Sequence, residues 1–396
     1  MVAGTTIAPV VQVKVADAFG NGVAGAPVAL SLTGAGTLTG GGSTFSDASG
    51  VASFASLSVE LTGTKQLTAM SGALTPATST SFTVSAAAAT TLSFVTQPSN
   101  VVAGVAIAPA VQVKVADAFG NGVAGASVTL ALSGTGTLNG GGPTLTDTAG
   151  LASFAALNLD VTGSKQLSAT SGALTPVPSA SFSVSAAAAA ALSFVTPPSD
   201  IVAGGTIAPA VQVRVADAFG NNVAGAPVTL SLLGSGTLTG GGAVPSDVTG
   251  LASFASLSVN LAGTKQLTAS TGALTPVSSS AFTVTAGAAT TLSFVTPPTN
   301  AVAGATIAPA VQVKVADAFG NGVAGSSVAL ALSGTGTLTG GGGILCDASG
   351  VASFAGLSVN LAGTKQLTAT SGVLTPTTST SFTVSAGAAE IGRAHV

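Results

Sequence analysis

The segment VQVKVADAFGNGVAG, which begins at Val11, returns almost unchanged at intervals of 100 residues, beginning again at Val111, Val211 and Val311. Solenoid repeats are about 20 to 50 residues long and do not fold singly, whereas about 100 residues suffice for a complete β-sandwich domain. A chain of 396 residues with this period therefore predicts four domains in tandem, each of which buries its own core.

Each copy of this segment contains a strand followed by a turn. Residues 11–15 alternate valine with a polar residue, and this period of two predicts a strand with one buried and one exposed face. Asp17 and the Gly-Asn-Gly sequence at 20–22 predict a turn, because an Asp side chain caps backbone N–H groups and Gly and Asn tolerate positive φ. The alternation resumes at residues 28–32, which predicts a second strand.

Turn signals divide each repeat into short strands, roughly seven in all, which predicts an all-β tandem array of Ig-like β-sandwich domains. A leading strand, TLSFVT at 91–96, opens the second repeat and recurs around Leu192 and Leu292, but the first repeat has no such strand. We therefore expect domains at 1–88, 89–188, 189–288 and 289–389, the first of them lacking its N-terminal strand.

Two segments do not follow a simple strand pattern. Residues 151–159 change parity, with the first apolar residues on one face and the leucines on the other, and a β-bulge near 155–156 would reconcile the two. The alanines at 186–191 are too few for an isolated helix, which needs about 12 to 15 residues to be even marginally stable. We expect a short junction between domains there instead.

The two ends of the chain carry separate expectations. Residues 390–396, EIGRAHV, stand where another leading strand would follow, and we interpret them as a non-native tail that holds the only histidine, His395. Residues 2–4 align with residues 102–104, so we expect the chain to begin inside a repeat, with the signal and the anchor outside it.

Composition restricts the possible partners. Charged residues make up only 5% of the chain and the net charge is −3, which leaves no basic patch for nucleic acid and no polybasic strip for a membrane surface. Hydrophobic residues reach 46%, so we expect the chain to fold. Because no run of about 18 uninterrupted apolar residues occurs, we expect no membrane insertion within this chain.

The order of VQVKVADAFGNGVAGAPVALSL, SDASGVASFASLSV and GTKQLTA resembles the bacterial Ig-like domains of the invasin and intimin group, which are Big_1-like. That pattern has an alternating strand, a D-x-x-G-N turn followed by V-x-G, a second strand, and then a D-x-x-G turn before another strand. The resemblance covers all four repeats. It implies an extracellular or bacterial cell-surface array in which most domains are spacers and adhesive activity belongs to a distal module.

The two turns of each repeat hold eight of the twelve acidic residues. Paired carboxylates can serve acid-base catalysis or calcium binding, but calcium takes about six to eight oxygen ligands, usually with several carboxylates close in sequence. A single Asp in a Gly-containing turn favours capping of the backbone instead. We therefore predict structural turns at Asp17, Gly20, Asn21, Asp47, Asp117, Gly120, Asn121, Asp147, Asp217, Gly220, Asn221, Asp247, Asp317, Gly320, Asn321 and Asp347.

Other chemistry finds little support in the sequence. No histidine lies within the repeats to act as a base for Ser or Thr, so we expect no enzyme. One aspartate per turn gives too few ligands for an ion, so we expect no metal, and no cofactor is expected. The glycine run at 40–42 lacks the GK[ST] sequence of a phosphate-binding loop, and the chain has no Trp or Tyr for a carbohydrate platform. Phe54, Phe82 and Phe94 are expected in the core, whereas Phe19 is expected to cover the sandwich end or the neighbouring domain.

The single cysteine, Cys346, excludes an intrachain disulfide. It stands where the other repeats have Ser46, Thr146 and Ser246, in the segment that differs most between repeats. We interpret it as an incidental unpaired thiol, with an intermolecular crosslink as the alternative.

Two functions agree with these observations. The first is a structural spacer or stalk of a bacterial cell-surface or secreted adhesin-like protein, whose partners are the neighbouring Ig-like domains of its own chain. The alternative is an adhesive array that binds a host or matrix protein through loops at the sandwich ends. Low charge and near-identical copies favour the spacer, whereas the adhesive array is favoured by variation at 43–46, 143–146, 243–246 and 343–346.

Overall fold

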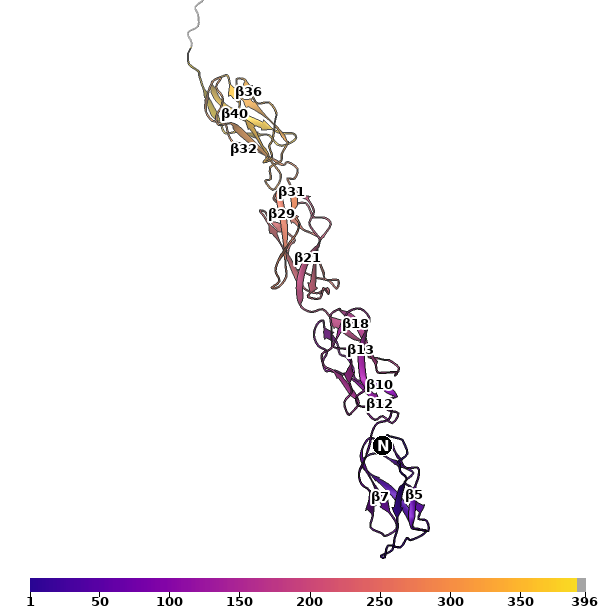
Figure 1. Ribbon diagram of the computed structural model, residues 1–396. Helices are drawn as coiled ribbons and strands as arrows, with labels where there is room; N and C mark the ends of the chain where they lie inside the picture. Colours follow the sequence, from indigo (N-terminus) through magenta and orange to yellow (C-terminus); the bar gives the residue numbers. More distant parts are fainter. Residues whose placement is uncertain (390–396) are drawn as a thin grey trace, which may run out of the picture. The chain divides into compact units, whose positions relative to one another are not determined.

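The computed structural model describes residues 1–389, and the predicted tail at 390–396 lies outside the described residues. Every regular element in the described part is a β-strand (Figure 1). The sheet pattern of the second repeat recurs in the third and fourth, and the first repeat shares it except for its N-terminal strands, which confirms the predicted all-β tandem array of Ig-like sandwiches. The chain divides into two compact units, one at Met1–Ala187 and the other from Ala188 onward, and each is described by itself. The domain boundaries proposed within them remain predictions.

The second repeat shows one sheet of the sandwich in full. It contains three antiparallel strands in the order β10 (Thr91–Thr96), β12 (Val111–Ala116) and β16 (Leu151–Phe154). The valines of β12 are fully buried, and the polar residues between them are half-buried on the other face. The alternation in the sequence therefore gives the strand with two distinct faces that it predicts.

The opposite sheet of the second repeat is built around β18 (Gly163–Thr170), which pairs with both β13 and β20. Its path runs β11 (Val101–Val102), β20 (Phe182–Ser185), β18, β13 (Ser127–Ser133) and β15 (Thr144–Leu145), while β19 (Val177–Pro178) also pairs with β18. The pair of β11 and β20 is parallel. A separate short sheet joins β14 (Leu138–Asn139) and β17 (Asn158–Leu159).

The third and fourth repeats have the same strand order as the second. In the third repeat the strands are β21 (Ala189–Thr196), β22 (Ile201–Val202), β23 (Val211–Asp217), β24 (Pro227–Leu233), β25 (Leu238–Thr239), β26 (Val244–Pro245), β27 (Leu251–Phe254), β28 (Ser258–Val259), β29 (Gly263–Ser270), β30 (Val277–Ser278) and β31 (Phe282–Thr285). In the fourth they are β32 (Thr291–Thr296), β33 (Ala301–Val302), β34 (Val311–Ala316), β35 (Ser327–Ser333), β36 (Leu338–Thr339), β37 (Ile344–Leu345), β38 (Val351–Phe354), β39 (Ser358–Val359), β40 (Gly363–Thr370), β41 (Thr377–Thr378) and β42 (Phe382–Ser385).

The first repeat has no counterpart of β10, as the sequence predicts. Its strand β1 (Val11–Lys14) pairs only with β5 (Val51–Phe54), so this sheet has two strands where the other repeats have three. The remaining strands are β2 (Pro27–Thr33), β3 (Leu38–Thr39), β4 (Thr44–Phe45), β6 (Ser58–Val59), β7 (Gly63–Met70), β8 (Ala77–Thr78) and β9 (Phe82–Val84). One edge of β1 is therefore open within the described residues of this unit.

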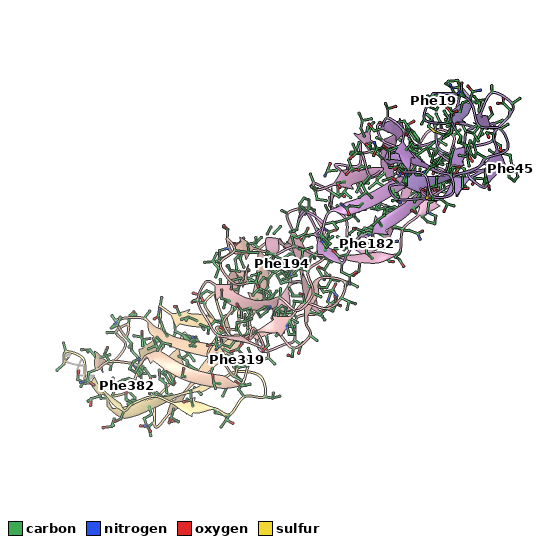
Figure 2. The ribbon with its side chains drawn as sticks, turned by 90° about the horizontal axis from the view of Figure 1, so that it is seen from below. Phe19, Phe45, Phe182, Phe194, Phe319 and Phe382 are labelled. Atoms are coloured by element: carbon green, nitrogen blue, oxygen red, sulfur yellow. The ribbon has the colours of Figure 1, made fainter. Side chains whose placement is uncertain are left out.

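Aromatic and branched side chains from both sheets fill each core. Phe54 is 4% exposed, and Phe82 and Phe94 are half-buried against the same kind of core. Phe182 and Phe382, which are labelled in Figure 2, are 4% and 3% exposed. The predicted core positions of the phenylalanines are thus occupied as expected.

The bulge predicted near residues 155–156 is wrong. β16 ends at Phe154 and pairs with β12, and after a turn the chain continues as β17, which pairs with β14 in a different sheet. Because the chain changes sheets at this turn, both sets of apolar residues reach one core, and Phe154 and Leu157 are 2% and 0% exposed. The parity change marks a corner of the sandwich.

The alanines at 186–191 form no helix, in agreement with the sequence. They are only partly a junction, however, since β21 begins at Ala189 and the last three alanines extend the leading strand of the third repeat. Ala189 lies opposite Asp217 and Ala191 opposite Ala216, with an irregularity in register between them.

Candidate functional site, a turn that docks on the preceding repeat

The DAFGN turn is held together by its aspartate. Asp17 Oδ1 accepts the backbone N–H groups of Phe19 and Asn21 at 2.9 Å each, and its Oδ2 accepts the Asn21 side-chain amide at 3.0 Å. Gly20 has a φ of 87°, in the left-handed region that a side chain disfavours. The same bonds and the same glycine conformation recur in the other repeats, at Asp117, Gly120, Asn121, Asp217, Gly220, Asn221, Asp317, Gly320 and Asn321.

The second turn closes against the first at the same end of the sandwich. Asp47 Oδ1 accepts the N–H groups of Ser49 and Val51 and the Ser49 hydroxyl. The Ser49 carbonyl lies so near Gly22 that an added Cβ there would be 2.1 Å from it. Equivalent capping bonds form at Asp147, Asp247 and Asp347. The two turns that the sequence singles out therefore form one surface.

Asn121 of the second repeat reaches into the first repeat. Its side-chain amide donates to the Glu60 carbonyl at 2.7 Å, and its Oδ1 accepts the Thr62 N–H at 3.0 Å. Both ends of one amide are thus bonded to a single stretch of backbone, which fixes its orientation as well as its position. We call residues 117–121 the docking turn and residues 60–62 the receiving loop, and we use the same names for their equivalents.

Asp117 and Phe119 extend this contact. The second carboxylate oxygen of Asp117 accepts the Ala87 N–H at 2.9 Å, in the segment that joins the two repeats. The Phe119 ring lies over Gly4, where an added Cβ would be 2.3 Å from the ring. Gly4 also has a φ of 70°, so a side chain at this position would meet both a steric clash and backbone strain.

A buried lysine supports the receiving loop from inside the first repeat. Lys65 is 3% exposed, and its ammonium donates to the carbonyls of Ala35 and Thr62 at 2.6 and 3.0 Å. The Thr62 carbonyl therefore accepts from Lys65, while the Thr62 N–H donates to Asn121. The buried Lys65 ammonium thus has carbonyl partners and links the receiving loop to Ala35 within the first repeat.

The second unit repeats this arrangement with its own residues. Asn321 donates to the Asn260 carbonyl at 2.9 Å and accepts the Ala262 N–H at 2.8 Å. Asp317 accepts the Gly287 N–H at 2.8 Å. The Phe319 ring lies over Gly204, where an added Cβ would be 2.5 Å from the ring. The docking turn therefore makes the same contacts in both units.

The docked and undocked copies of the turn differ in exposure. Asp117 and Asn121 are 1% and 6% exposed, whereas Asp17 and Asn21 are exposed. Phe19 is 91% exposed, compared with 39% for Phe119 (Figure 2 labels Phe19). The expectation that this phenylalanine covers the neighbouring domain is met by Phe119. Sequence reasoning missed the receiving loop, because it contributes mainly backbone groups and these leave no residue signature.

Hydrogen bonding sets the ionisation of the docking aspartate. Burial opposes the charge on Asp117, but the Asn121 amide and the N–H groups of Ala87 and Asn121 outweigh it and hold the pKa below 3.8. The pKa of Asp317 is lowered in the same way. A lowered pKa in the folded state means that the carboxylate stabilises the docked turn above the unfolded value, and that this stabilisation is lost as the pH falls through the lower folded value.

We therefore expect docking to be constant at neutral pH and to weaken only in strong acid. The Ala87 amide proton should report this in an NMR titration, because its acceptor is the Asp117 carboxylate. The expected result is a chemical-shift change with a midpoint below 3.8, the ordinary value for Asp, and no such change in an Asp117→Asn variant. A midpoint at or above the ordinary value would contradict the hydrogen-bonded arrangement.

The turn aspartates present few oxygens to an ion. Each has an oxygen already occupied by N–H donors of its own turn, and within residues 1–389 no group of three or more His, Cys, Asp or Glu side chains could hold a metal. This part of the chain also contains no helix that is long and apolar enough to cross a membrane.

Cys346 is a buried free thiol, 6% exposed. The hydroxyl of Ser46 at the equivalent position accepts the Ala26 N–H at 2.9 Å and donates to the Val23 carbonyl at 2.6 Å. Burial raises the pKa of the Cys346 thiol, which keeps it protonated and unreactive at neutral pH. The burial of Cys346 and the raised pKa of its thiol favour an incidental substitution over a crosslink.

No protein-family model and no curated protein matches the chain. Among solved structures, it is similar to the Escherichia coli adhesin FdeC, with 19% identity over 76% of this chain and 97% of that chain and a TM-score of 0.35. It is also similar to invasin, a bacterial integrin-binding protein, with 16% identity over 96% of this chain and 76% of that one and a TM-score of 0.36. The D0-D1 domain of intimin matches at 18% identity over 50% of this chain and 98% of that one, with a TM-score of 0.21. Because all three TM-scores are below 0.5, the Ig-like fold is assigned from the strand order of the repeats and not from these similarities.

Proposed function

We propose that the chain is a structural spacer of a bacterial cell-surface or secreted adhesin-like protein. The observation that carries this proposal is the asparagine of the docking turn, which makes two hydrogen bonds to the repeat before it, through Asn121 in one unit and Asn321 in the other. A spacer needs a joint that resists bending, and two paired, part-buried hydrogen bonds restrict rotation about the junction as well as separation.

Further features of the docking turn agree with this role. Phe119 and Phe319 cover a glycine of the preceding repeat, which adds apolar contact beside the polar one. The contact uses residues of the recurring DAFGN segment, and it forms in the same way within each of the two units. The proposed surface location is supported by the resemblance of this segment to the invasin and intimin group.

A second candidate function, adhesion, is favoured by one observation. The segments that vary most between repeats form the short strands β4, β15, β26 and β37, which lie at the end of the sheet path. Phe45, Leu145 and Leu345 on these strands are 68%, 66% and 68% exposed. Exposed apolar residues on an edge strand can contact a partner.

Binding to host cells separates the two candidates. Beads coated with the purified chain should bind a layer of host epithelial cells, or immobilised matrix protein, no more than beads coated with serum albumin. The matched control replaces all three exposed residues, as Phe45→Ser, Leu145→Ser and Leu345→Ser. Binding by the parent chain that this triple variant abolishes would overturn the spacer proposal in favour of adhesion through the variable edge strands.

A further inference from the structure

Three of the four docking turns end in an asparagine that is followed by glycine. These Asn-Gly pairs stand at 21–22, 121–122 and 321–322, whereas Asn221 is followed by Asn222. An asparagine side chain reacts most readily with the backbone nitrogen of the next residue when that residue is glycine, because no side chain hinders the approach. The residue that makes the joint is therefore also the residue of the turn most open to this reaction.

Glycine is needed at this place because the two turns of the repeat meet there. An added Cβ at Gly122 would lie 2.0 Å from the Ala149 carbonyl oxygen of the second turn. No side chain fits at that distance, so the close approach of the two turns requires a residue without one. The fold of the docking turn thus brings the reactive pair with it.

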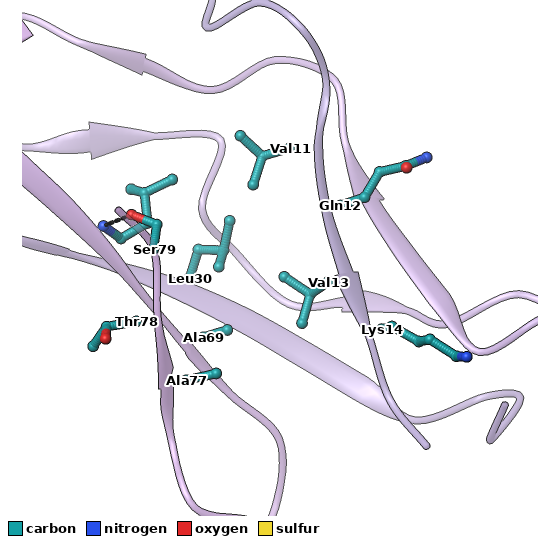
Figure 3. Close-up of a pocket in the computed structure, with 10 residues that line it drawn as sticks. Val11, Gln12, Val13, Lys14, Leu30, Ala69, Ala77, Thr78 and Ser79 are labelled. Atoms are coloured by element: carbon teal, nitrogen blue, oxygen red, sulfur yellow. Dashed lines mark hydrogen bonds between the residues drawn. The ribbon is translucent and has the colours of Figure 1, made fainter. Parts of the chain in front are cut away.

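A basic residue on the neighbouring strand supports the turn beside this glycine. Figure 3 shows Lys14 of β1 pointing away from Val11 and Val13, which point into the sandwich. The Lys14 ammonium donates to the Gly20 carbonyl at 3.3 Å, and the equivalent bonds in the second and fourth repeats measure 3.1 and 2.8 Å. The lysine therefore holds the carbonyl that directly precedes the docking asparagine.

The third repeat lacks the glycine and changes the basic residue with it. Asn222 stands at the glycine position, and Arg214 stands at the lysine position. Arg214 Nη2 donates to the Gly220 carbonyl at 2.6 Å, and its Nε donates to the Asn222 side-chain oxygen at 2.8 Å. Asn221 still donates to Asp217 from its backbone and from its side chain. The turn therefore forms without the reactive pair when both positions change.

Reaction of the pair needs only water and base. The Gly122 nitrogen attacks Cγ of Asn121, a C–N bond forms, and the bond from Cγ to Nδ2 breaks. The attacking nitrogen loses a proton to solvent and the leaving group gains one, so ammonia departs. Water then opens the resulting succinimide ring at either carbonyl, which gives aspartate or isoaspartate at residue 121. The rate rises with pH, because the attacking nitrogen must lose its proton.

The product cannot make the docking contacts. Asn121 Nδ2 donates to the Glu60 carbonyl at 2.7 Å and to Asp117 Oδ2 at 2.9 Å. A carboxylate in this place has no N–H to donate and sets its negative oxygen against two acceptors, one of them charged. Isoaspartate also lengthens the backbone by a carbon atom. The same pair of acceptors faces the equivalent asparagine in the second unit.

Docking opposes the reaction. Attack makes the planar amide of Asn121 tetrahedral at Cγ, and this displaces both the oxygen that accepts from Thr62 and the nitrogen that donates to Glu60. Asn21 has the same bonds within its own turn, but its side chain is exposed in this chain. The two asparagines differ in docking and not in local sequence, since both stand in the same stretch DAFGNGV.

We propose that the Asn-Gly pair of the docking turn is a self-modification site, at Asn121 and Asn321, where succinimide formation releases the joint and docking slows the reaction. A joint that stays closed keeps its asparagine, whereas a joint held open loses it and no longer closes in the same way. The release of the joint rests on the proposed spacer function, but the slowing of the reaction by docking does not.

Peptide mapping by mass spectrometry tests the control of the reaction by docking. The full chain is incubated at mildly alkaline pH, and the exchange of ammonia for water is followed at each asparagine. We expect Asn121 to react at least about tenfold more slowly than Asn21, a ratio that corresponds to about 1.4 kcal/mol, and the two to react alike in urea. Phe119→Ser removes the ring from Gly4 and should raise the rate at Asn121, whereas Phe19→Ser should not.

Amide hydrogen exchange tests the release of the joint. Protection of the Thr62 N–H should fall in the incubated parent chain in step with the product at residue 121. In a variant with Lys114→Arg and Gly122→Asn, which copies the third repeat, this protection should stay constant through the same incubation. Asn121→Asp makes one product directly and should show the fall before any incubation. Circular dichroism should show that all variants fold.

Two kinds of result would overturn the proposal. Equal rates at Asn121 and Asn21 in the folded chain, or no effect of Phe119→Ser, would overturn the slowing of the reaction by docking. Full protection of the Thr62 N–H in Asn121→Asp would overturn the release of the joint. The spacer function is tested separately, by the binding of the chain to host cells.

Discussion

Fusion of the sequence AATTLSFVTQPSN ahead of Met1 should stabilise the first repeat by several kcal/mol. The fused strand would place a leucine and a phenylalanine against Val15 and Val13, as β10 does in the second repeat, where Leu92 is buried and Phe94 is half-buried. Full burial of one such side chain is worth about 1.5–3 kcal/mol, and the half-buried phenylalanine contributes a part of that. This is a large share of a domain stability of about 5–15 kcal/mol. Limited proteolysis should cut the parent chain first between residues 1 and 88, and the fused chain should resist cleavage there.

A fusion that carries serine at the leucine and phenylalanine positions provides the control. It adds the same length of chain and the same backbone groups, but not the apolar burial, and we expect little protection from it. If the first repeat of the parent chain proves as resistant as the second, then the leading strand contributes little to stability. The predicted boundary near residue 88 would then need to be redrawn.

Removal of the docking asparagine should uncouple neighbouring repeats without unfolding them. Asn121→Ala deletes two hydrogen bonds to the receiving loop, and the loss of partners for buried polar groups costs about 1–3 kcal/mol. Protection of the Thr62 N–H against hydrogen exchange should fall by that amount. Protection within β12 and β18 should change little, because the core of the second repeat is not touched.

The first repeat supplies the matched variant for this experiment. Asn21 makes the same bonds within its own turn, but its side chain is exposed. Asn21→Ala therefore removes the contribution of the asparagine to the turn alone. A fall in Thr62 protection in Asn121→Ala and none in Asn21→Ala assigns the effect to docking, whereas equal behaviour of the two variants would assign it to the turn.

Much of the fold follows from local pattern. The alternation at residues 11–15 predicts β1 and its counterparts, because a strand between core and solvent has a period of two. The absence of TLSFVT before the first repeat predicts its two-stranded sheet. The corner after Phe154 could not be predicted as such, because a bulge and a change of sheet produce the same parity change, and only the pairing of β17 with β14 distinguishes them.

The candidate site was predictable in part. The residue types of Asp117, Gly120 and Asn121 already predict a turn, and the turn forms in every repeat. Its docking was not predictable, because the partners are the backbone groups of Glu60, Thr62 and Ala87, which any sequence could offer. The signal available in the sequence was Phe119, a large apolar residue in a polar turn, which indicates that something covers it.

Double electron-electron resonance distances between spin labels measure the stiffness of the joint between the first two repeats. Spin labels at Thr83→Cys and Ser183→Cys would lie on equivalent exposed strand positions of the two repeats. Cys346→Ser removes the only native thiol and restores the residue found at Ser46 and Ser246. We predict a narrow distance distribution in this background, unchanged by Asn21→Ala and clearly broadened by Asn121→Ala. A distribution that is broad from the start, or that Asn121→Ala leaves unchanged, would contradict a docked joint and with it the spacer function.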